Sequence, residues 1–434
     1  MNKKVLLSIG LLSAILIIFA VNSTATRLET DSKTADEPRK DPFDREITGP
    51  VRAYGYGGTA EMTNPFFWVR FAQEKGFDTD EVLLTPAQIR VAVENMASQG
   101  NLRLRLPETI REITTVTHAE LVELAQNHNY MNRGRGFRHY VPVFSGSRNT
   151  QLGVMTSWAQ MTRIPTNTPE RMDLETGIEV AEGVVIYREY NGFLLVKAQN
   201  YFGWIPKSTV ATVSRAEFNK YVLPAEFIVV TAERIPTSLG VPTMLRMGTK
   251  LPLVAQNGNN ITFRIPTRNE DGTLGAPFDK TLAIDDRELI HVGYLPYTTT
   301  NLLKQMFRQL GQVYGWGDQN SDRDCSSALW AAYKCFGFLL PRNTAQQRLI
   351  EAGRYTIVIS GNNEEIFNAL SETTFRPGVI ILMPGHVMMY LGKIDNRHYI
   401  IHQSGGTRNA HKVTGLDIYS TLDNIVAFER NIHY

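Results

Sequence analysis

Hydrophobic residues recur at helical spacing in three stretches of the chain. The first, at residues 85–100, begins with Thr-Pro-Ala-Gln, which supplies an N-cap, a first-turn proline and a capping-box glutamine. The second covers residues 301–310, the third covers residues 324–336, and a glycine follows each of these two. The pattern therefore predicts one helix in the N-terminal third of the chain and two in its C-terminal third.

Alternating stretches in the middle of the chain predict short strands that are joined by tight turns. Arg-Ile-Pro-Thr at residues 163–166 recurs at residues 234–237, and a glycine follows 14 residues after each arginine. Each copy is followed by strand-like segments around an Asn-Gly turn. A third copy of the four residues, at 264–267, breaks this register. We interpret the pattern as a duplication that forms two small β-barrels in tandem.

Two further strands are predicted near the C-terminus, one beginning at His386 and the other at His398. If residues 392–396 form a five-residue loop between them, His386 lies directly opposite His402, with the Cβ atoms about 5 Å apart. A two-residue turn at 395–396 would place His402 elsewhere. The mixture of segregated helices and antiparallel strands predicts an α+β fold.

The N-terminus carries an apolar run at residues 5–21 that follows two lysines and ends at small residues. This composition predicts a signal peptide, residues 1–25, that is cleaved after Ala25. The alternative is that the run is not cleaved and anchors the chain to a membrane. The expected organisation beyond it is a linker at 26–48, a mainly helical segment at 49–135, β modules at 136–215 and 222–290, and a catalytic domain at 294–434.

The composition of the 434-residue chain is that of a globular protein, with 43% hydrophobic and 20% charged residues. A formal net charge of +2 gives no electrostatic footprint for nucleic acid, so no nucleic-acid partner is expected. Two cysteines are too few for a scaffold that depends on disulfides.

Both cysteines, Cys325 and Cys335, fall on the helix predicted at residues 324–336. Ten residues of helix separate them by about 15 Å, which is beyond the roughly 7 Å limit for a disulfide. Cys335 lies near the end of the apolar stripe and is expected to be a core residue. Cys325 lies in the first turn, where the helix dipole favours a thiolate.

Cys325, His386 and His402 together form a candidate nucleophile, base and orienting residue. The same three side chains could ligate zinc. No paired ligands at close spacing on a helix accompany them, and His398 and His402 are about 13 Å apart on a strand. The sequence therefore favours nucleophilic catalysis, and no metal or other cofactor is expected.

These residues resemble the NlpC/p60 family of papain-like cell-wall cysteine peptidases. The resemblance covers about the last 140 residues and rests on six motifs: Tyr314-Gly315-Trp316-Gly317-Asp318, Asp324-Cys325-Ser326-Ser327, Pro341-Arg342-Asn343-Thr344, Pro377-Gly378-Val379, the strand His386–Gly392, and His402. Asp318, Val379 and Asn343 depart from the family's usual residues. Two SH3-like domains and an N-terminal stabilising segment also occur in family members, and Gly203-Trp204 matches the end of such a domain.

The resemblance implies that Cys325 is the nucleophile, His386 the general base and then acid, and His402 the orienting residue. It implies a hydrolase that cleaves the amide between γ-D-glutamate and the diamino acid of murein peptides. Seven residues are expected to contact the substrate: Tyr314, Trp316, Asp324, Ser326, Arg342, Asn343 and Thr344. Asp324 would hold the free amine of an N-terminal L-alanine, and Ser326 and Thr344 would meet the D-glutamate carboxylate.

Peptidoglycan or its peptides are thus the expected partner, and an exported, periplasmic or cell-envelope location fits that substrate. The first SH3-like module would shape the substrate pocket, or would serve wall attachment or spacing. Three other activities use the same features: an N-acetylmuramoyl-L-alanine amidase, an acyltransferase that passes the thioester to an amine, and a cell-wall-binding protein without activity.

Overall fold

The computed structural model of the protein describes most of residues 53–416, together with three short strands outside this range. The gaps inside the range are residues 55, 101, 103, 128–138, 200, 285–287, 351–355, 360–361, 373–374 and 405–409. The flanking strands are β1 (Arg39–Lys40), β2 (Glu46–Ile47) and β24 (Ile425–Phe428). The expected signal peptide and most of the expected linker lie outside the described residues. No helix in the part of the chain that is described has the length and apolar character to cross a membrane.

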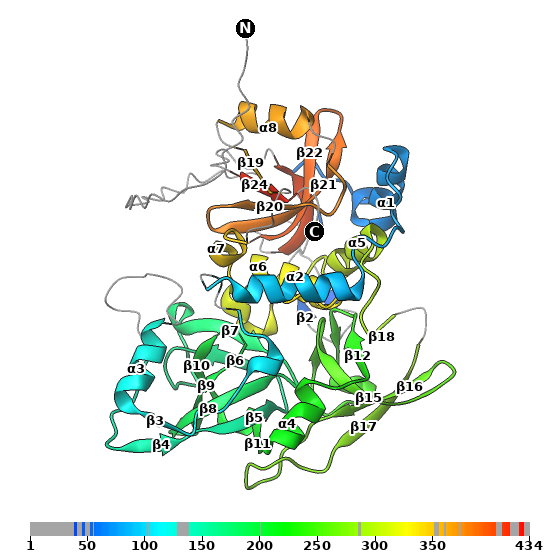
Figure 1. The fold of residues 1–434 in the computed structure, drawn as a ribbon. Coiled ribbons are helices and arrows are strands. Elements are labelled where there is room, and N and C mark those ends of the chain that lie inside the picture. The colour runs from blue at the N-terminus through cyan, green and yellow to red at the C-terminus, as the bar shows by residue number, and fades with distance from the viewer. Residues whose placement is uncertain are drawn as a thin grey trace. The chain divides into compact units, whose positions relative to one another are not determined.

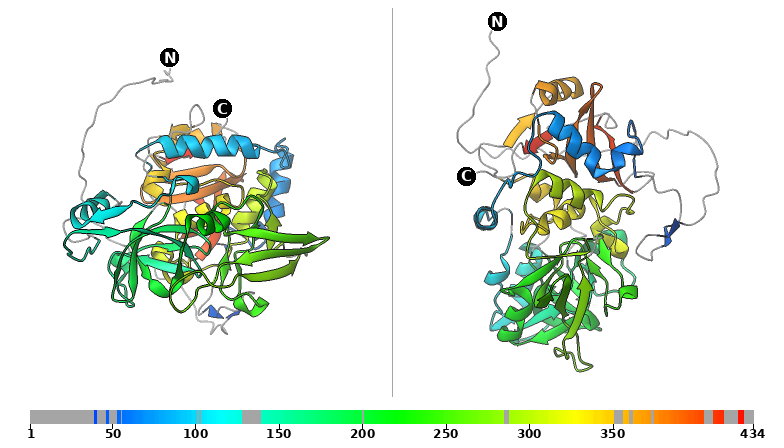
Figure 2. Two further views of the ribbon diagram at one scale, coloured as in Figure 1. Left: turned by 60° about the horizontal axis from the view of Figure 1, so that its bottom comes forward. Right: turned by 90° about the vertical axis from the view of Figure 1, so that its right-hand side faces the viewer.

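A six-stranded antiparallel sheet forms the centre of the C-terminal region (Figure 1). Its order is β19 (Thr356–Ile359), β24, β20 (Ile380–Met383), β21 (His386–Ile394), β22 (Arg397–Ser404) and β23 (Ala410–Gly415). Helix α8 (Asn363–Glu372) packs on one face through Ile366 and Leu370. Helices α5 (Thr299–Phe307) and α6 (Cys325–Lys334) share a different hydrophobic core with this sheet, and the short α7 (Thr344–Gln347) follows them. Figure 2 shows α8 and α6 separated by the strands.

The N-terminal helices divide between two cores. Helices α1 (Pro65–Glu74) and α2 (Pro86–Ser98) contribute Trp68, Val69, Ile89 and Val93 to the core that contains α5 and α6. Helix α3 (His118–Asn127) instead packs against the β-rich region through Leu121 and Ala125. The helix expected at residues 85–100 is confirmed with its capping box: Gln88 N donates to Thr85 Oγ1, and Thr85 N donates to Gln88 Oε1.

Two antiparallel sheets in the middle of the chain have the same strand order. The first β module runs β11 (Val210–Val213), β5 (Gln151–Met155), β8 (Gly183–Tyr190), β9 (Phe193–Lys197) and β10 (Phe202–Pro206). The second β module runs β18 (Ile290–Val292), β12 (Phe227–Val230), β15 (Lys250–Asn257), β16 (Asn260–Ile265) and β17 (Phe278–Ala283). A further pair of strands also lies at each Arg-Ile-Pro-Thr copy. In the first module β6 (Ala159–Thr162) pairs with β7 (Leu174–Ile178), and in the second β13 (Arg234–Ile235) pairs with β14 (Leu245–Arg246). This shared topology supports the duplication.

The modules differ at Gly203-Trp204. In the first module β10 pairs with β6, so that the sheet continues into β6 and β7. A Cβ atom on Gly203 would lie 2.7 Å from both Met161 Cγ and Thr162 O, so only glycine permits this approach. The second module lacks the motif, and within the described residues β17 does not pair with β13. The two modules are therefore open sheets and not the expected closed barrels, since in the described part of the chain no strand pairing closes either sheet.

Two further elements connect these parts. Helix α4 (Arg215–Val222) begins at a capping box made by Ser214 and Glu217 and joins the first module to the second. The short pair β3 (Thr115–Thr117) and β4 (Ser147–Asn149) precedes the first module.

The cysteine helix is as expected, since α6 begins at Cys325 and its N-cap is Asp324. Both cysteines are free, and Cys335 is fully buried, with its thiol directed at Val230 O and Ala331 O. The prediction that Cys335 is a core residue is confirmed.

Candidate active site

Cys325 is the first residue of α6, where the sequence Asp-Cys-Ser-Ser ends an irregular loop and begins a helix. Only 8% of the residue is exposed. Its Sγ lies 3.6 Å from Thr344 Oγ1 and within hydrogen-bonding reach of the backbone N–H of Val387. The helix start, the α7 segment and strand β21 therefore meet at this sulfur.

His386 immediately precedes Val387, whose backbone N–H reaches this sulfur, and His386 contacts His402 directly. The distance between His386 Nε2 and His402 Nδ1 is 2.8 Å, and the ring planes are 76° apart. A hydrogen bond at Nε2 leaves Nδ1 as the nitrogen of His386 that can exchange a proton with a neighbouring thiol. The expected pairing of the two histidines is thus present.

The connection between the two histidine strands differs from the five-residue loop expected from the sequence. Strands β21 and β22 are joined by a two-residue turn at Asp395 and Asn396, and Ile394 pairs with Arg397. Both turn residues have positive φ, 46° and 64°, as a type I′ hairpin requires. The expectation that His386 lies directly opposite His402 is therefore wrong.

A β-bulge restores the contact. In the register set by the turn alone, His402 would face Met389 and would lie on the opposite side of the sheet from His386. The register shifts between Tyr390 and Gly392, after which Met389 pairs with Ile401. The extra residue moves His402 to the same side as His386, in a diagonal position, where the ring nitrogens can meet.

The electrostatic environment keeps the candidate nucleophile and base neutral at rest. Burial, and then the charge of Asp324, raise the pKa of Cys325 to about 11. Burial lowers the pKa of His386 to about 4, against the opposing effect of Asp324. The thiolate that the helix dipole alone would favour is therefore disfavoured, and the neutral forms of the Cys325 thiol and the His386 imidazole are favoured at rest.

The carboxylate of Asp324, the residue before Cys325, accepts hydrogen bonds from several protein groups. Arg342 binds it in a bidentate manner, with Nη1 3.0 Å from Oδ1 and Nη2 2.9 Å from Oδ2. Ser326 Oγ and Ser327 N also donate to Oδ1, and Gly317 N donates to Oδ2. The carboxylate thus fixes the helix start, and its lone pairs are largely used within the protein.

Asp318 connects this arrangement to the first β module. Its Oδ2 accepts a hydrogen bond from Gly177 N (3.0 Å) and lies 3.1 Å from Arg342 Nη2. Arg246 of the second module lies 3.9 Å from its other oxygen. Burial alone would raise the pKa of Asp318, but Arg342, Arg246 and Arg323 hold it well below its ordinary value. Asp318 has a φ of 65°, so these contacts offset a backbone strain that glycine would avoid.

A pocket of about 160 Å³ opens above Cys325. The catalytic region supplies six of the residues expected at the substrate, and Arg342 is not among the residues that line the pocket. Those six are Tyr314, Trp316, Asp324, Ser326, Asn343 and Thr344. Arg342 lies below the pocket, where its donors engage Asp324, Ser326 and Thr176.

The first β module closes one side of the pocket with residues that the sequence did not indicate. They are Arg163, Leu174, Glu175 and Tyr201. Arg163 Nε donates to Glu175 Oε1, and Tyr201 Oη donates to Asn343 Oδ1 at 2.6 Å. None of the described lining residues comes from the second module. Tyr201 immediately precedes the Phe-Gly-Trp motif, which is the one sequence signal that could have located it.

Tyr314 and Trp316 lie on the loop that precedes the cysteine. Burial, and then the charges of Cys325 and Asp324, raise the pKa of Tyr314 far above its ordinary value. Its hydroxyl therefore keeps its proton and can act as a hydrogen-bond donor. The guanidinium of Arg171, from the first module, lies 5.0 Å from the Trp316 ring.

In the described part of the chain, no three His, Cys, Asp or Glu side chains gather as they would around a metal ion.

Residues 311–423 match the model of the NlpC/P60 family, so the chain carries an NlpC/P60 domain. An NlpC/P60 endopeptidase from Photobacterium damselae subsp. piscicida has a similar fold, with 16% identity and a TM-score of 0.54 over 80% of this chain and 87% of that one. An NlpC/P60 family protein from Bacillus cereus ATCC 10987 aligns with 14% identity and a TM-score of 0.45 over 64% of this chain and 99% of that one. The comparison with curated proteins gives no match.

The fold likeness to the Photobacterium endopeptidase covers far more of this chain than the matched domain, so it includes part of the region before residue 311. Members of the NlpC/P60 family are generally papain-like cysteine endopeptidases of the cell wall, and they are typically found in the cell envelope.

Proposed function

We propose that this chain, which carries an NlpC/P60 domain at residues 311–423, hydrolyses murein peptides between γ-D-glutamate and the diamino acid. The observation that carries the proposal is that Cys325 lines a confined pocket and its sulfur meets the Val387 N–H, while the preceding residue, His386, is hydrogen-bonded to His402. Peptidoglycan peptides are the substrate class on which the family generally acts.

In this proposal catalysis begins with a neutral Cys325 thiol and a neutral His386 imidazole. His386 takes the thiol proton as Cys325 Sγ attacks the γ-carbonyl carbon, which avoids the cost of a buried resting ion pair. The imidazolium then donates this proton to the leaving amine of the diamino acid, and a thioester remains on Cys325. Water, deprotonated by His386, releases the acyl group. His402 holds the His386 ring in place through the 2.8 Å contact.

The oxyanion that forms at the attacked carbonyl requires donors close to Cys325. The backbone N–H of Ser327 already donates to Asp324, so the candidate donors at the start of α6 are the N–H groups of Cys325 and Ser326, which the first turn of a helix leaves without intrahelical partners. The protonated hydroxyl of Tyr314 is a further candidate donor, since Tyr314 lines the same pocket.

Two carboxylates in the pocket, Asp324 and Glu175, suit a substrate with a free amine at its N-terminal L-alanine. Because Arg342 already binds both oxygens of Asp324, Glu175 of the first module shares this role in our proposal. Ser326 and Thr344 supply hydroxyls for the α-carboxylate of D-glutamate. Tyr201 closes the side of the pocket and restricts it to short peptides.

The two β modules, at residues 136–215 and 222–290, are SH3-like in this proposal, and the first acts as a specificity module. Their common five-strand order supports this assignment, and so does the Gly203-Trp204 motif in the first. The segment at 49–135 stabilises the catalytic region through α1 and α2, and residues 1–25 direct export to the cell envelope, where the substrate lies.

The test is incubation of purified wild type and Cys325→Ala with L-Ala-γ-D-Glu-diaminopimelate and with intact sacculi, followed by mass analysis. Release of free diaminopimelate and L-Ala-γ-D-Glu by wild type alone supports the proposal. Undiminished cleavage by Cys325→Ala would refute it, and so would inactivity of wild type on both substrates. Release from sacculi of sugar-free peptides that begin with L-alanine would instead indicate the amidase activity.

A further inference from the structure

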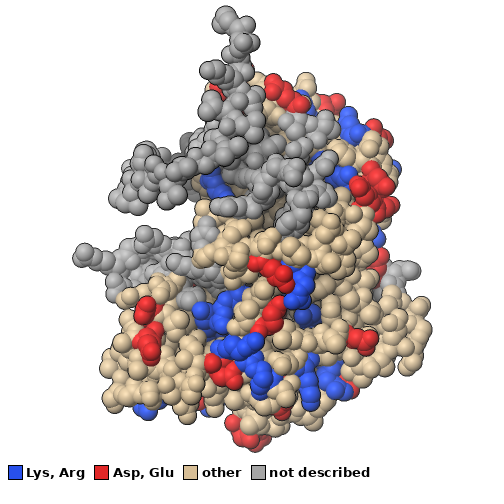
Figure 3. Space-filling model, in the orientation of Figure 1, with Lys and Arg blue, Asp and Glu red and all other residues tan. Residues whose placement is uncertain are grey.

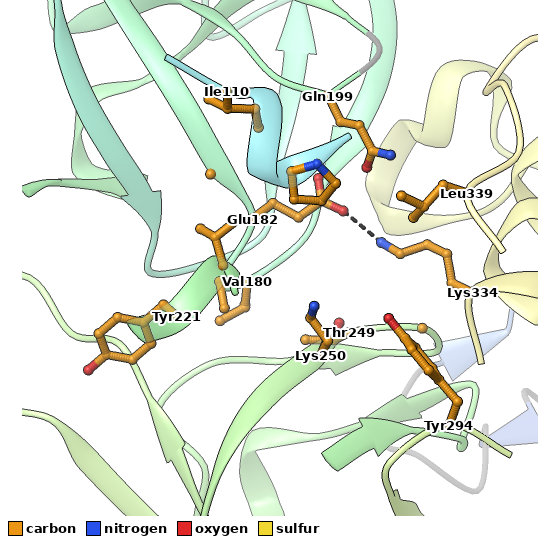
Figure 4. A pocket seen from close by; sticks show the side chains of 15 residues that line it. Ile110, Val180, Glu182, Gln199, Tyr221, Thr249, Lys250, Tyr294, Lys334 and Leu339 are labelled. Atoms are coloured by element: carbon orange, nitrogen blue, oxygen red, sulfur yellow. Dashed lines mark hydrogen bonds and ion pairs between the residues drawn. The ribbon is translucent and has the colours of Figure 1, made fainter. Parts of the chain in front are cut away.

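A second cavity, of about 90 Å³, lies at the opposite end of α6 from Cys325 (Figure 4). Both β modules, the catalytic region and the N-terminal segment contribute to its walls. Lys334, the last residue of α6, lies on one side of it, and the segment Gly248–Lys250 of the second module lies on another. Ten helical residues, about 15 Å, separate it from the candidate nucleophile, so it is a separate site.

Charged groups in this cavity leave one positive charge in excess. Lys334 Nζ forms an ion pair with Glu182 Oε1 at 2.7 Å. Lys250 also lines the cavity, and in the described part of the chain no carboxylate pairs with it. Burial, and then the charge of Lys334, lower the pKa of Lys250 to about 8, and its Nζ lies over the Phe227 ring, 5.3 Å from the ring centroid. Figure 3 shows that basic and acidic side chains are interspersed on this face of the molecule.

Two neutral polar groups in the cavity are also left without partners. Thr249 is 1% exposed, and its hydroxyl has no hydrogen-bond partner within the described residues. The same holds for the side-chain N–H₂ group of Gln199, which Figure 4 shows on the other side of the Glu182–Lys334 pair from Lys250. A buried polar group without a partner is costly, and such groups normally meet water or a ligand.

The remaining wall is apolar, and a ligand for this cavity must therefore combine polar and apolar parts. Ile110, Val180, Val222 and Leu339 surround the polar groups. A water needs on the order of 10–15 Å³ of such volume, so the cavity holds several waters or one small organic molecule. The carboxylate of Glu182 disfavours an anion with more than one charge.

We propose that this cavity binds a small monocarboxylate, with its carboxylate at Lys250 and Thr249 and its aliphatic part against Leu339 and Val180. The two polar groups supply an ammonium and a hydroxyl, which donate to the lone pairs of one carboxylate. The source is either a free carboxylic acid or the C-terminus of a short peptide. This inference does not rest on the proposed hydrolase activity.

The test uses wild-type protein and propionate as the probe, with propionamide as the neutral analogue of the same shape and N-acetyl-alanine as the peptide-terminus analogue. Ligand-observed NMR titration gives each dissociation constant. We expect saturable propionate binding, at least about tenfold weaker binding of propionamide, and at least about tenfold weaker propionate binding to Lys250→Met. Tighter binding of N-acetyl-alanine than of propionate would identify the peptide terminus as the source, and the reverse order would identify the free acid.

Lys207→Met is the matched control, because Lys207 lies on the surface and pairs with Glu189. It should bind propionate as wild type does. Equal affinity for propionate and propionamide, or unchanged affinity of Lys250→Met, would overturn the proposal. Absence of saturable propionate binding to wild type would also overturn it.

A second measurement needs no variant. An amine with a pKa near 8 reacts readily with trinitrobenzenesulfonate at pH 8, and peptide mapping reports the extent at Lys250 alone. Bound propionate should slow this labelling in a saturable manner and propionamide should not.

The charged and titratable groups that face Lys250 are Lys334, Glu182, Glu108 and Tyr294. Because Lys250 loses its charge above pH 8, propionate affinity should fall between pH 7 and 9. Labelling that is unaffected by propionate would contradict the assignment.

Discussion

His386 Nε2 lies 2.8 Å from His402 Nδ1, although the two residues are diagonal rather than opposite in the ladder. The bulge before Gly392 makes this possible. Gly392 has a φ of 145°, and a Cβ atom there would lie 2.3 Å from Phe71 Cε1 of α1. The N-terminal helix α1 therefore packs directly on the irregularity that brings the two histidines together.

The first prediction concerns His402. Replacement by alanine removes the contact that orients the His386 ring, and kcat should fall roughly 10²–10⁴-fold. Replacement by asparagine should restore part of the loss, because an amide can still hydrogen-bond to the ring. The measurement is kcat and KM for the tripeptide substrate.

His398 provides the matched control for His402. It lies on the same strand, contacts Tyr390 Oη and Ser371 Oγ, and has no part in the His386–His402 contact. The His398→Ala variant should lose stability but keep kcat within a few-fold. If both alanine variants lost activity equally, the orienting role of His402 would be refuted.

The second prediction concerns the protonation state at rest. With its pKa raised to about 11, Cys325 should be thiolate in only roughly one part in ten thousand at pH 7. Alkylation of Cys325 by iodoacetamide should therefore rise about tenfold per pH unit from pH 7 to 10. Because the pKa of His386 is about 4, kcat/KM should hold down to pH 5 and fall as His386 becomes protonated near pH 4. An alkylation rate that is constant above pH 6 would show a resting ion pair instead.

The third prediction concerns Asp318. The isosteric Asp318→Asn change leaves Arg342 and Arg246 buried with one carboxylate fewer, and should lower the free energy of unfolding by about 3–5 kcal/mol. Urea denaturation measures the change. Asp279→Asn is the control, since its pair with Arg264 is exposed and should be worth less than about 1 kcal/mol. Similar losses for the two variants would contradict the view that Asp318 joins the β modules to the catalytic region.

The fourth prediction concerns Tyr201. The Tyr201→Ala change opens the side of the pocket that the first module closes, so kcat/KM for the free tripeptide should fall about tenfold or more. The ratio of the activity on sacculi to the activity on the tripeptide should rise. Tyr201→Phe keeps the ring and loses the hydrogen bond to Asn343, so it should retain the preference for the tripeptide. If Tyr201→Ala kept the wild-type preference, the first module would have no part in selecting the substrate.

Local signals in the sequence were sufficient for helices α2, α5 and α6 but did not lead to a prediction of α1, α3, α4, α7 or α8. Thr85 and Gln88 form the capping box that their spacing predicts, and α6 begins at Cys325 as the position of Asp324 indicates. Such features depend on residues three or four positions apart, so they can be recognised without tertiary information.

The register of the two histidines could not be predicted in the same way. Asp395 and Asn396 form a two-residue turn, which the sequence allowed, but the bulge before Gly392 depends on packing against Phe71, more than three hundred residues away in sequence. Only the combination of turn and bulge places His402 on the same side as His386.

The resting charge of Cys325 and the specificity residues also depend on tertiary structure. A helix N-terminus predicts a thiolate, but burial and the nearby Asp324 raise the pKa of Cys325 and so oppose that prediction. Glu175 and Tyr201 reach the pocket because Asp318 fixes the first module to the catalytic loop through Gly177. Nothing in the local sequence around Glu175 indicates this contact.

The central claim is that Cys325 forms the acyl intermediate. The direct measurement is rapid acid quench of wild type with excess L-Ala-γ-D-Glu-diaminopimelate, followed by intact-protein mass and peptide mapping. The account predicts a transient L-Ala-γ-D-Glu adduct on the peptide that contains Cys325, formed as fast as diaminopimelate is released and absent from Cys325→Ala. An adduct on a different residue, or equal formation in the alanine variant, would contradict it.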